Sequence, residues 1–337
     1  MRTHTWNSRM VVKGLVGVAA SALILSGCGG RQDQAQDDGA GAGSCKESAG
    51  QVTIATGNST GVYYVMGGGI ASVLEDKTEL RASAAETGAS VQNIEQLVAG
   101  DYDIAFSLAD TAADAVEGKG SFDEAQPVEA LGRIHTNYTQ VVARKGANID
   151  SIEDFAGKTV STGSPKSGTE VIANRLIEAA GLTSDDISAQ RLDIDKSVNG
   201  LKDGSIDAIV WSGGLPTPAL TDLYTSDADK VEFIDIMPLL PKLQEISPVY
   251  EEDSIPADTY KTDADIPTIS VPNVLLVTEE FPENNSCAVT KAIFENSDAL
   301  AKVHPAAKEL DPETGQDTDP IPLAPGAETA LKELAGE

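Results

Sequence analysis

The sequence predicts an α/β protein whose body is built from two lobes. A chain of 337 residues is long enough for two domains, each with its own core. Short apolar, β-branched segments alternate with amphipathic helical segments, which indicates parallel strands joined by helical crossovers. This strand-and-helix pattern occurs twice, about 105 residues apart. We therefore expect two parallel-type mixed sheets with flanking helices, and a ligand in the cleft between the lobes.

The composition excludes several classes of function. Asp and Glu number 53 against 24 Lys and Arg, a formal net charge of −29. Nucleic-acid binding is excluded, because it needs clustered basic residues. The hydrophobic fraction of 41% excludes a disordered chain, and three cysteines are too few for a disulfide scaffold.

The first 27 residues read as an export signal. Three basic residues precede the apolar stretch 14–25, which is too short to cross a membrane but suits a signal-peptide core. The stretch ends in Leu25-Ser26-Gly27-Cys28, which resembles the bacterial lipobox. We expect residues 1–27 to be a lipoprotein signal peptide and Cys28 to be lipidated, anchoring the protein to the membrane. The alternative is an ordinary export signal with a cysteine nearby.

Residues 28–45 read as a flexible tether, because they combine Gly, Ala, Gln and Asp without apolar periodicity. With Cys28 lipidated, Cys45 and Cys287 remain as an even pair in an oxidising compartment. We expect these two to form a disulfide. The alternative is one buried and one exposed thiol.

The first repeated unit is a strand, a Thr-Gly turn and a helix. It occurs at Gln51–Leu74 and again at Lys158–Gly181. In the first copy Val62, Met66, Ile70 and Val73 or Leu74 fall on one helical face. In the second, Ser167 and Glu170 form a capping-box pattern and Gly181 is a helix stop.

The second repeated unit is a helix end, a glycine stop and a buried strand. Leu97–Ser107 and Leu201–Trp211 share the pattern Leu-x-x-Gly-x-x-Asp before an apolar run. We expect Asp103 and Asp207 to close the turn after the glycine and not to contact a ligand.

Two extended stretches, His135–Gly146 and Thr268–Phe281, suit a pair of crossings between the lobes. If the chain leaves and returns there, lobe 1 comprises residues 46–140 and 272–337, and lobe 2 comprises residues 141–271. A hinge with two crossings allows closure around a ligand.

Several segments together resemble one known family. They are TGNSTGVYY, TGASVQN, GDYDIAFS, GSPKSGT, GSIDAIVWSGGLPTPAL and IPLAPGAE, which run in order from Val52 to Glu328. In order and spacing they are similar to the TAXI-type solute receptors of TRAP transporters. The resemblance implies a two-lobed, periplasmic-binding-protein-like fold of class II type. It also implies a small organic acid or acidic amino acid as ligand and a TRAP membrane permease as partner. The chain departs from the family pattern at TGAS, at the lysine of SPKSGT and at Ala324.

Hydroxyl side chains at predicted helix starts support a carboxylate pocket, because free N–H groups and hydroxyls can bind an anion without a basic residue. For each hydroxyl the alternative is a plain helix cap. The candidate ligand-binding residues are Ser59, Thr60, Tyr63, Ser90, Ser107, Ser164, Lys166, Ser167, Gly168, Thr169, Trp211 and Gly213. Lys166, Arg133 and Arg144 are possible counter-charges, and Tyr64 is a possible flanking aromatic residue.

Enzyme and cofactor readings have weaker support. Gly57–Gly61 matches G-x-S-x-G at a strand-to-helix turn, but it follows the first strand of the body, too early for a nucleophile elbow. GSPKSGT lacks the Gly-Lys-Ser/Thr order of a phosphate loop. No His or Cys cluster has metal-ligand spacing, and the Asp-rich stretch Thr262–Ile266 suits a solvated loop.

We therefore expect a non-enzymatic, lipid-anchored, extracytoplasmic receptor without metal or cofactor, which binds a small carboxylate for a TRAP permease. A sensory protein of the same fold that signals to a membrane partner is the alternative. A serine hydrolase is a more distant one.

Overall fold

The computed structural model describes residue 45 and residues 49–337. The predicted signal peptide, Cys28 and residues 29–44 of the predicted tether lie outside the described residues. Within the described range, no helix has both the length and the apolar character needed to cross a membrane.

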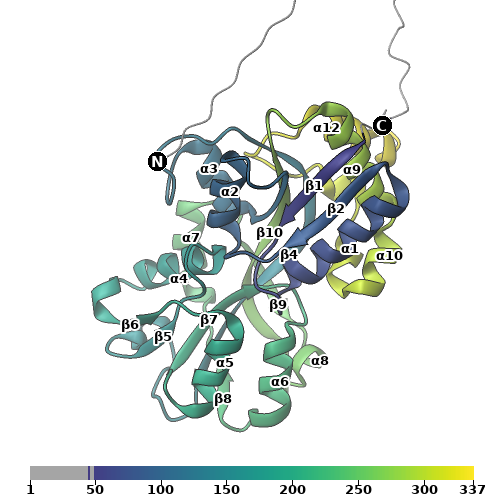
Figure 1. Ribbon diagram of the computed structural model, residues 1–337. Helices are drawn as coiled ribbons and strands as arrows, with labels where there is room; N and C mark the ends of the chain where they lie inside the picture. Colours follow the sequence, from purple (N-terminus) through teal and green to yellow (C-terminus); the bar gives the residue numbers. More distant parts are fainter. Residues whose placement is uncertain (1–44, 46–48) are drawn as a thin grey trace, which may run out of the picture. The chain divides into compact units, whose positions relative to one another are not determined.

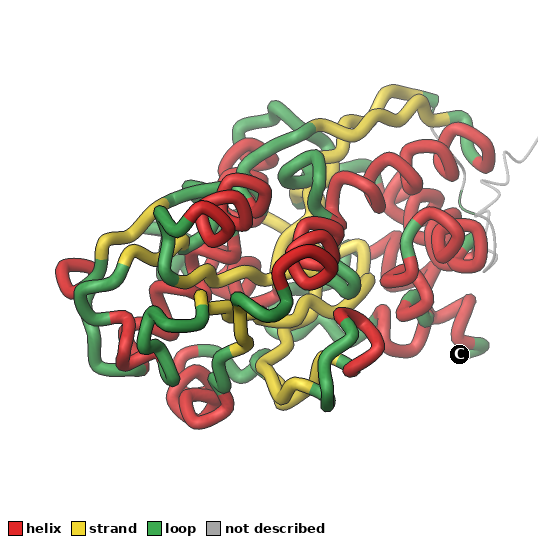
Figure 2. Tube along the Cα trace, turned by 90° about the horizontal axis from the view of Figure 1, so that it is seen from below, coloured by secondary structure: helices red, strands yellow, loops and turns green. Residues whose placement is uncertain are grey.

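Ten strands form one hydrogen-bonded mixed sheet with helices packed around it (Figure 1; Figure 2). The strands are β1 (Gly50–Ala55), β2 (Leu80–Ala85), β3 (Ile104–Leu108), β4 (Val128–Arg144), β5 (Thr159–Ser161), β6 (Ser188–Gln190), β7 (Ala208–Gly213), β8 (Val231–Phe233), β9 (Glu251–Ile255) and β10 (Ile266–Thr278).

The main path of the sheet runs β2-β1-β3-β10-β4-β7-β5-β6. β1 lies parallel to β2 and β3, and β5 lies parallel to β6 and β7. The long strands β4 and β10 run antiparallel to each other, and each also lies antiparallel to the last strand of one parallel set. The two lobes therefore repeat the same order, and their sheets are continuous through β4 and β10.

β4 and β10 change partners partway along their length. β4 pairs with β10 from Val128 to Tyr138, and from Tyr138 onward it pairs with β7. β10 pairs with β9 from Ile266 to Ser270 and with β4 beyond that point. The two predicted crossings are thus continuous strands. We use the predicted residue ranges as the definitions of lobe 1 and lobe 2.

The helices follow the strands in an alternating order. They are α1 (Val62–Lys77), α2 (Ser90–Val98), α3 (Ala109–Glu117), α4 (Gly168–Ala179), α5 (Ile194–Asp203), α6 (Pro218–Asp227), α7 (Leu240–Ile246), α8 (Ala257–Tyr260), α9 (Glu283–Glu295), α10 (Ser297–Val303), α11 (Pro312–Gly315) and α12 (Pro325–Ala335). Short 3-10 helices lie at Ile152–Phe155, Ser184–Asp186, Met237–Leu239 and Pro305–Glu309.

The predicted buried face of α1 and the predicted glycine stops after α2 and α5 are confirmed. Val62, Met66, Ile70 and Leu74 of α1 are buried on one face. Gly100 and Gly204 follow α2 and α5 with φ angles of 79° and 81°, a left-handed conformation that glycine adopts without steric cost.

Apolar residues form three buried clusters. One lies within lobe 1 and joins α1, α9 and α12 to its strands. A second lies within lobe 2 and joins α5 and α6 to its strands. The third is shared by both lobes, and it includes Ile94 and Leu108 of lobe 1 with Ile172 and Leu176 of lobe 2. The lobes are therefore in direct apolar contact.

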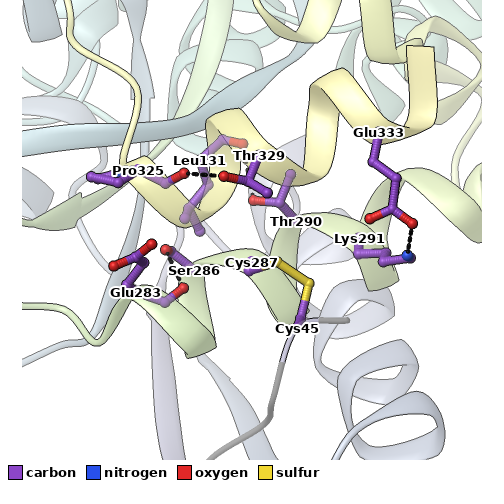
Figure 3. Close-up of a disulfide and its surroundings, with 10 residues drawn as sticks. All are labelled: Cys45, Leu131, Glu283, Ser286, Cys287, Thr290, Lys291, Pro325, Thr329 and Glu333. Carbon is purple, nitrogen blue, oxygen red and sulfur yellow. Dashed lines mark hydrogen bonds and ion pairs between the residues drawn. A yellow bond between two sulfur atoms is a disulfide. The ribbon is translucent and has the colours of Figure 1, made fainter. Parts of the chain in front are cut away.

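A disulfide joins the start of the described chain to a late helix. Cys45 is bonded to Cys287 of α9, 242 residues away in the sequence (Figure 3). α12 packs against the same helix, and one of the contacts between them is an ion pair from Lys291 to Glu333 at 2.7 Å (Figure 3). The disulfide thus links the segment before β1 to the C-terminal helices of lobe 1.

Candidate functional site

A cavity lies between the two lobes, where three helices begin. The centre of a water molecule can reach about 40 Å³ of it. It is lined by Gly57, Asn58, Gly61, Val62, Tyr63, Ala89, Ser90, Leu108, Asn137, Ser164, Ser167, Gly168, Thr169, Trp211, Ser212 and Gly213.

The N-termini of α1, α2 and α4 meet at this cavity. The residues that cap them are Gly61, Ala89 and Ser167. The first N–H groups of an α-helix have no partner within the helix, and the helix dipole adds partial positive charge there. Only Ser167 provides a side-chain cap, accepting a hydrogen bond from the N–H of Glu170 at 3.1 Å. The cavity wall is therefore rich in backbone donors.

Ala89 has an unusual backbone conformation at the start of α2. Its φ and ψ angles are 77° and −155°, in a region that is essentially restricted to glycine. The turn is held by the N–H of Ala89, which donates to Thr87 Oγ1 at 3.2 Å, and by the N–H of Gln92, which donates to the carbonyl of Lys166 at 3.1 Å. The site thus stores backbone strain where lobe 1 meets lobe 2.

Hydroxyl groups from both lobes surround the same space. Ser164 Oγ of lobe 2 donates to Asn58 Oδ1 of lobe 1 at 3.2 Å. Ser90 Oγ accepts from the N–H of Leu108 at 3.1 Å, and the Ser90 side chain also forms a hydrogen bond with Tyr63. Ser212 is 5% exposed and lines the cavity, yet its Oγ has no hydrogen-bond partner. A buried hydroxyl without a partner costs free energy unless a ligand or water satisfies it.

An asparagine network from the crossing strands forms another wall. Tyr63 donates its hydroxyl proton to Asn273 Oδ1. Asn273 Nδ2 in turn donates to the carbonyl of His135 and to Asn137 Oδ1, both at 3.0 Å. Burial raises the pKa of Tyr63, so this phenol stays protonated. Asn137 itself lines the cavity, and its side chain also interacts with His135.

No charged side chain lines the cavity among the residues that the structure describes. Charged groups instead join the two lobes outside it. Lys166 Nζ pairs with Glu95 at 2.6 Å, and Thr60 Oγ1 donates to Asp195 Oδ2 at 2.7 Å. Closure of the lobes is thus supported by polar contacts that do not themselves reach the cavity.

Most of the candidate residues converge on this cavity. Those that line it are Tyr63, Ser90, Ser164, Ser167, Gly168, Thr169, Trp211 and Gly213. Four others do not line it: Ser59, Thr60, Ser107 and Lys166. Ser59 is exposed, and Ser107 is buried within β3, where its Oγ donates to the carbonyl of Leu108. Which of the lining residues contact a ligand stays a prediction.

Arg133, Arg144 and Tyr64 also lie outside the cavity lining. Arg133 lies near Asp317 at 3.6 Å, and Arg144 pairs with Asp207 at 2.8 Å. Tyr64 is 37% exposed on the surface of α1. The physical reason is that acidic residues outnumber basic ones in this chain, so Arg133 and Arg144 each lie beside a carboxylate instead of the cavity.

Asn58, Asn137 and Ser212 also line the cavity, although they were not among the candidate residues. Asn58 lies inside the GNSTG turn, and Ser212 directly follows Trp211, so both adjoin residues that were selected. Asn137 belongs to no motif. The available signal was the polar run Thr136–Gln140 within a crossing strand, since polar side chains in a buried strand indicate a function or a network.

The geometry of a serine hydrolase is absent around Ser59 in the described residues. The N–H of Ser59 donates to Glu86 Oε1 at 3.1 Å. Of the two histidines that the structure describes, His135 is buried with both ring nitrogens unpartnered, and His304 Nδ1 accepts from the N–H of Ala306. Neither therefore serves as a base for Ser59.

A buried ion cluster connects the lobes away from the cavity. Arg175 of α4 donates to Asp110 at 2.8 Å and to Asp114 at 2.5 Å, both on α3. Tyr250 donates to Asp110 and accepts from Arg175. Burial opposes the charge on Arg175, but Tyr250 and the two aspartates raise its pKa above the ordinary value. This cluster joins α3 to lobe 2.

A second cavity, with about 320 Å³ open to water centres, is lined by residues 133–135 of β4 and by residues between 308 and 314. Unlike the interlobe cavity it is lined by charged side chains, among them Arg133, Lys308, Glu309 and Asp311. The carboxylate of Glu309 accepts from the N–H of Thr136 at 2.7 Å. Its mixed charges distinguish it from the interlobe cavity.

Comparisons with known proteins agree with this architecture. A protein of Bordetella bronchiseptica RB50 is 22% identical, with a TM-score of 0.52 over 85% of this chain and 88% of that chain. The binding-protein component of a phosphonate ABC transporter from Pseudomonas aeruginosa is 11% identical, with a TM-score of 0.53 over 86% and 95%. PhnD1 from Prochlorococcus marinus, solved with methylphosphonate, is 8% identical, with a TM-score of 0.52 over 77% and 90%.

These structures share with this chain the two-lobed α/β fold of periplasmic binding proteins. The sequence itself matches the model of the NMT1-like family over residues 54–334, which is nearly the whole described body. The chain therefore belongs to the NMT1-like family and has the two-lobed fold of periplasmic binding proteins.

Proposed function

We propose that this protein is an extracytoplasmic solute receptor that binds a small carboxylate between its lobes. The observation that carries the proposal is the meeting of three helix N-termini and several hydroxyls at one cavity whose described lining bears no charge. Backbone N–H groups at helix starts are suited to an anion. A strongly acidic chain, with a formal net charge of −29 over all 337 residues, can thus hold an anion through local donors.

The energetics of such a site are reasonable. Each helix dipole contributes about 0.3–1 kcal/mol, and up to about 2 kcal/mol when the charge is partly buried. A micromolar dissociation constant corresponds to about −8 kcal/mol. Hydrogen bonds to charged oxygens contribute about 1.5–3 kcal/mol each, and together with three helix ends they must also offset an association cost of about 4–15 kcal/mol.

We further propose that the receptor is lipidated at Cys28 and delivers its ligand to a TRAP-type permease. The support is the lipobox-like sequence at residues 25–28 and the ordered resemblance to TAXI-type receptors from Val52 to Glu328. The fold is that of binding proteins, which favours a non-enzymatic role.

A titration tests the binding step. After removal of residues 1–27, Trp211 is the remaining tryptophan, and it lines the cavity. Its fluorescence and the thermal stability of the mature protein are followed with glutamate, glutamine, 2-oxoglutarate, C4-dicarboxylates and monocarboxylates. A ligand at about a hundred times its dissociation constant adds about 2.7 kcal/mol to the free energy of unfolding. No response after unfolding and refolding, which removes carried-over ligand, contradicts the proposal.

The transport step has a separate test. Deleting the gene is expected to abolish uptake of the ligand identified above, and a copy with Cys28→Ser is expected to leave the membrane fraction. Binding with unchanged uptake would favour a sensory role for the same fold.

A further inference from the structure

We infer that the ligand is a short monocarboxylate with an uncharged remainder, of the 2-oxo or 2-hydroxy acid class, and is not an amino acid or a dicarboxylate. The inference rests on the proposed function, because it concerns the same cavity. It goes further by naming which carboxylates are accepted and which are rejected.

The anionic end of such a ligand is matched by groups that lack partners. The first-turn N–H groups of Gly168 and Thr169 lie at the cavity with those of α1 and α2. Ser212 Oγ is buried and unpartnered at the same cavity. One carboxylate oxygen can accept this hydroxyl proton, which satisfies a group that is otherwise costly to bury.

An ammonium group has no acceptor of opposite charge here. Three carboxylates have partners next to cavity-lining residues in the sequence: Glu86 accepts from the N–H of Ser59, Glu95 pairs with Lys166, and Asp195 accepts from Thr60. None of them lines the cavity. An α-ammonium group would also lie among positive helix ends, which repel it. The site therefore discriminates against amino acids.

A second carboxylate also lacks a counter-charge. Lys166, which lies in the turn before α4, does not line the cavity, and its ammonium group pairs with Glu95 at 2.6 and 2.9 Å. The accessible volume of about 40 Å³ favours a ligand of few atoms. A dianion would have to bury its second charge without a partner, which costs free energy.

The remainder of the ligand is met by one donor and an apolar wall. Asn137 lines the cavity and its Oδ1 already accepts from Asn273, so in this inference the ligand meets the Nδ2 donor of Asn137. A donor at this position selects a carbonyl or hydroxyl oxygen, which suits the 2-oxygen of an oxo or hydroxy acid. Leu108, Val62 and Trp211 provide apolar surface for a short carbon chain.

Calorimetric titration of the full chain in detergent tests the inference with matched pairs. Pyruvate is compared with alanine, 2-oxobutyrate with 2-aminobutyrate, and lactate with succinate. We expect saturable binding of the oxo or hydroxy monocarboxylate, and binding at least about 100-fold weaker for the amino acid of the same skeleton and for the dicarboxylate.

The outcomes separate a failure of the predicted ligand selectivity from a failure of the proposed receptor function. If alanine, glutamate or succinate binds as tightly as the oxo acids, the inference is overturned while the receptor function stands. If neither these compounds nor the wider panel bind refolded protein at millimolar concentration, the proposed function fails with it.

Variants of cavity residues should change the affinities for pyruvate and alanine differently, which a general loss of stability would not do. Asn137→Asp places a carboxylate where the donor was, so we expect pyruvate binding to weaken at least about 100-fold while alanine binding does not weaken. Ser212→Ala is expected to weaken pyruvate binding about 10-fold. Ser270→Ala is the matched control, because Ser270 Oγ is also buried and unpartnered but does not line the cavity. Equal effects of Ser212→Ala and Ser270→Ala would overturn the assignment.

Discussion

Asp103 and Asp207 perform the same structural task in the two lobes. Asp103 Oδ2 accepts from the N–H of Thr53 in β1 at 2.7 Å, and Asp207 Oδ2 accepts from the N–H of Thr159 in β5 at 3.0 Å. In each lobe the aspartate follows a left-handed glycine and precedes the third parallel strand. Each carboxylate thus ties the start of that strand to the first strand of its lobe.

This equivalence places the two Thr-Gly turns on opposite sides of one cavity. β1 and β5 end in these turns, and the turns lead into α1 and α4, whose N-termini line the cavity. The internal repeat therefore explains why the site has two opposed helix starts. The third helix start, that of α2, has its counterpart in α5, which lines no part of the cavity.

Replacing Ala89 with glycine should stabilise the protein. Ala89 has a φ of 77° in a glycine-only region, and such strain costs about 1–3 kcal/mol. Glycine loses about 0.4–1 kcal/mol through the entropy of the unfolded chain. We therefore expect Ala89→Gly to raise the free energy of unfolding by about 1 kcal/mol in urea denaturation. An Ala99→Gly control, at a helical φ of −72°, should lower it.

Removing Arg175 should destabilise the protein strongly. Its loss leaves Asp110 and Asp114 buried without their cation, and breaking a buried pair costs about 3–5 kcal/mol. We expect that loss for Arg175→Ala by chemical denaturation. The control is Arg191→Ala, because Arg191 pairs with Glu170 but is half exposed, and exposed pairs contribute about 0–1 kcal/mol. Similar losses for both variants would contradict the account.

Stability should fall as the pH is lowered through the range where histidine titrates. Burial lowers the pKa of His135 to about 3, and the nearby His304 contributes to the decrease. Between pH 6.5 and 3 the unfolded state binds a proton that the folded state does not, so the free energy of unfolding is largest above pH 6.5. The slope is up to about 1.4 kcal/mol per pH unit for this group.

The variant His135→Gln separates the pH dependence that arises from His135 from the pH dependence that arises from Asp and Glu side chains. Its unfolding free energy should depend less steeply on pH between 6.5 and 4.5 than that of the wild-type protein. Parallel curves would show that His135 does not carry the effect. His304, whose pKa is also lowered by burial, supplies the same sign of dependence in both proteins.

Breaking the disulfide should destabilise lobe 1 without altering the cavity. The Cys45–Cys287 bond closes a loop of 242 residues and lies on α9 (Figure 3). Loss of a native disulfide costs about 2–5 kcal/mol. We expect Cys287→Ser to lower the free energy of unfolding by that amount with ligand affinity unchanged. A reducing agent should then affect the wild-type protein and not the variant.

The fold was largely predictable because its signals are local. The repeated turns, the glycine stops and the helix face of α1 each depend on residues close together in the sequence, and all are found as expected. The chain's two crossings were also recognisable as extended stretches. Their continuity as β4 and β10 was not, because strand partners are chosen across the sheet.

The site was predictable only where it lies at helix starts. Ser167 and Thr169 belong to a recognisable turn, and they line the cavity. Asn137 was missed because its role depends on Asn273, which is far away in the sequence. The position of Lys166 in that turn predicts a counter-charge for the ligand. In the structure its ammonium group instead pairs with Glu95 of lobe 1.

Hydrogen–deuterium exchange reports on the proposed anion site itself, because the proposed anion contacts are backbone N–H groups. Saturating ligand should slow exchange in residues 61–65, 89–93 and 167–171, which contain the three helix starts. Residues 305–314, at the second cavity, should be unchanged. Protection of residues 305–314, or no protection at the three helix starts, would contradict an anion site between the lobes.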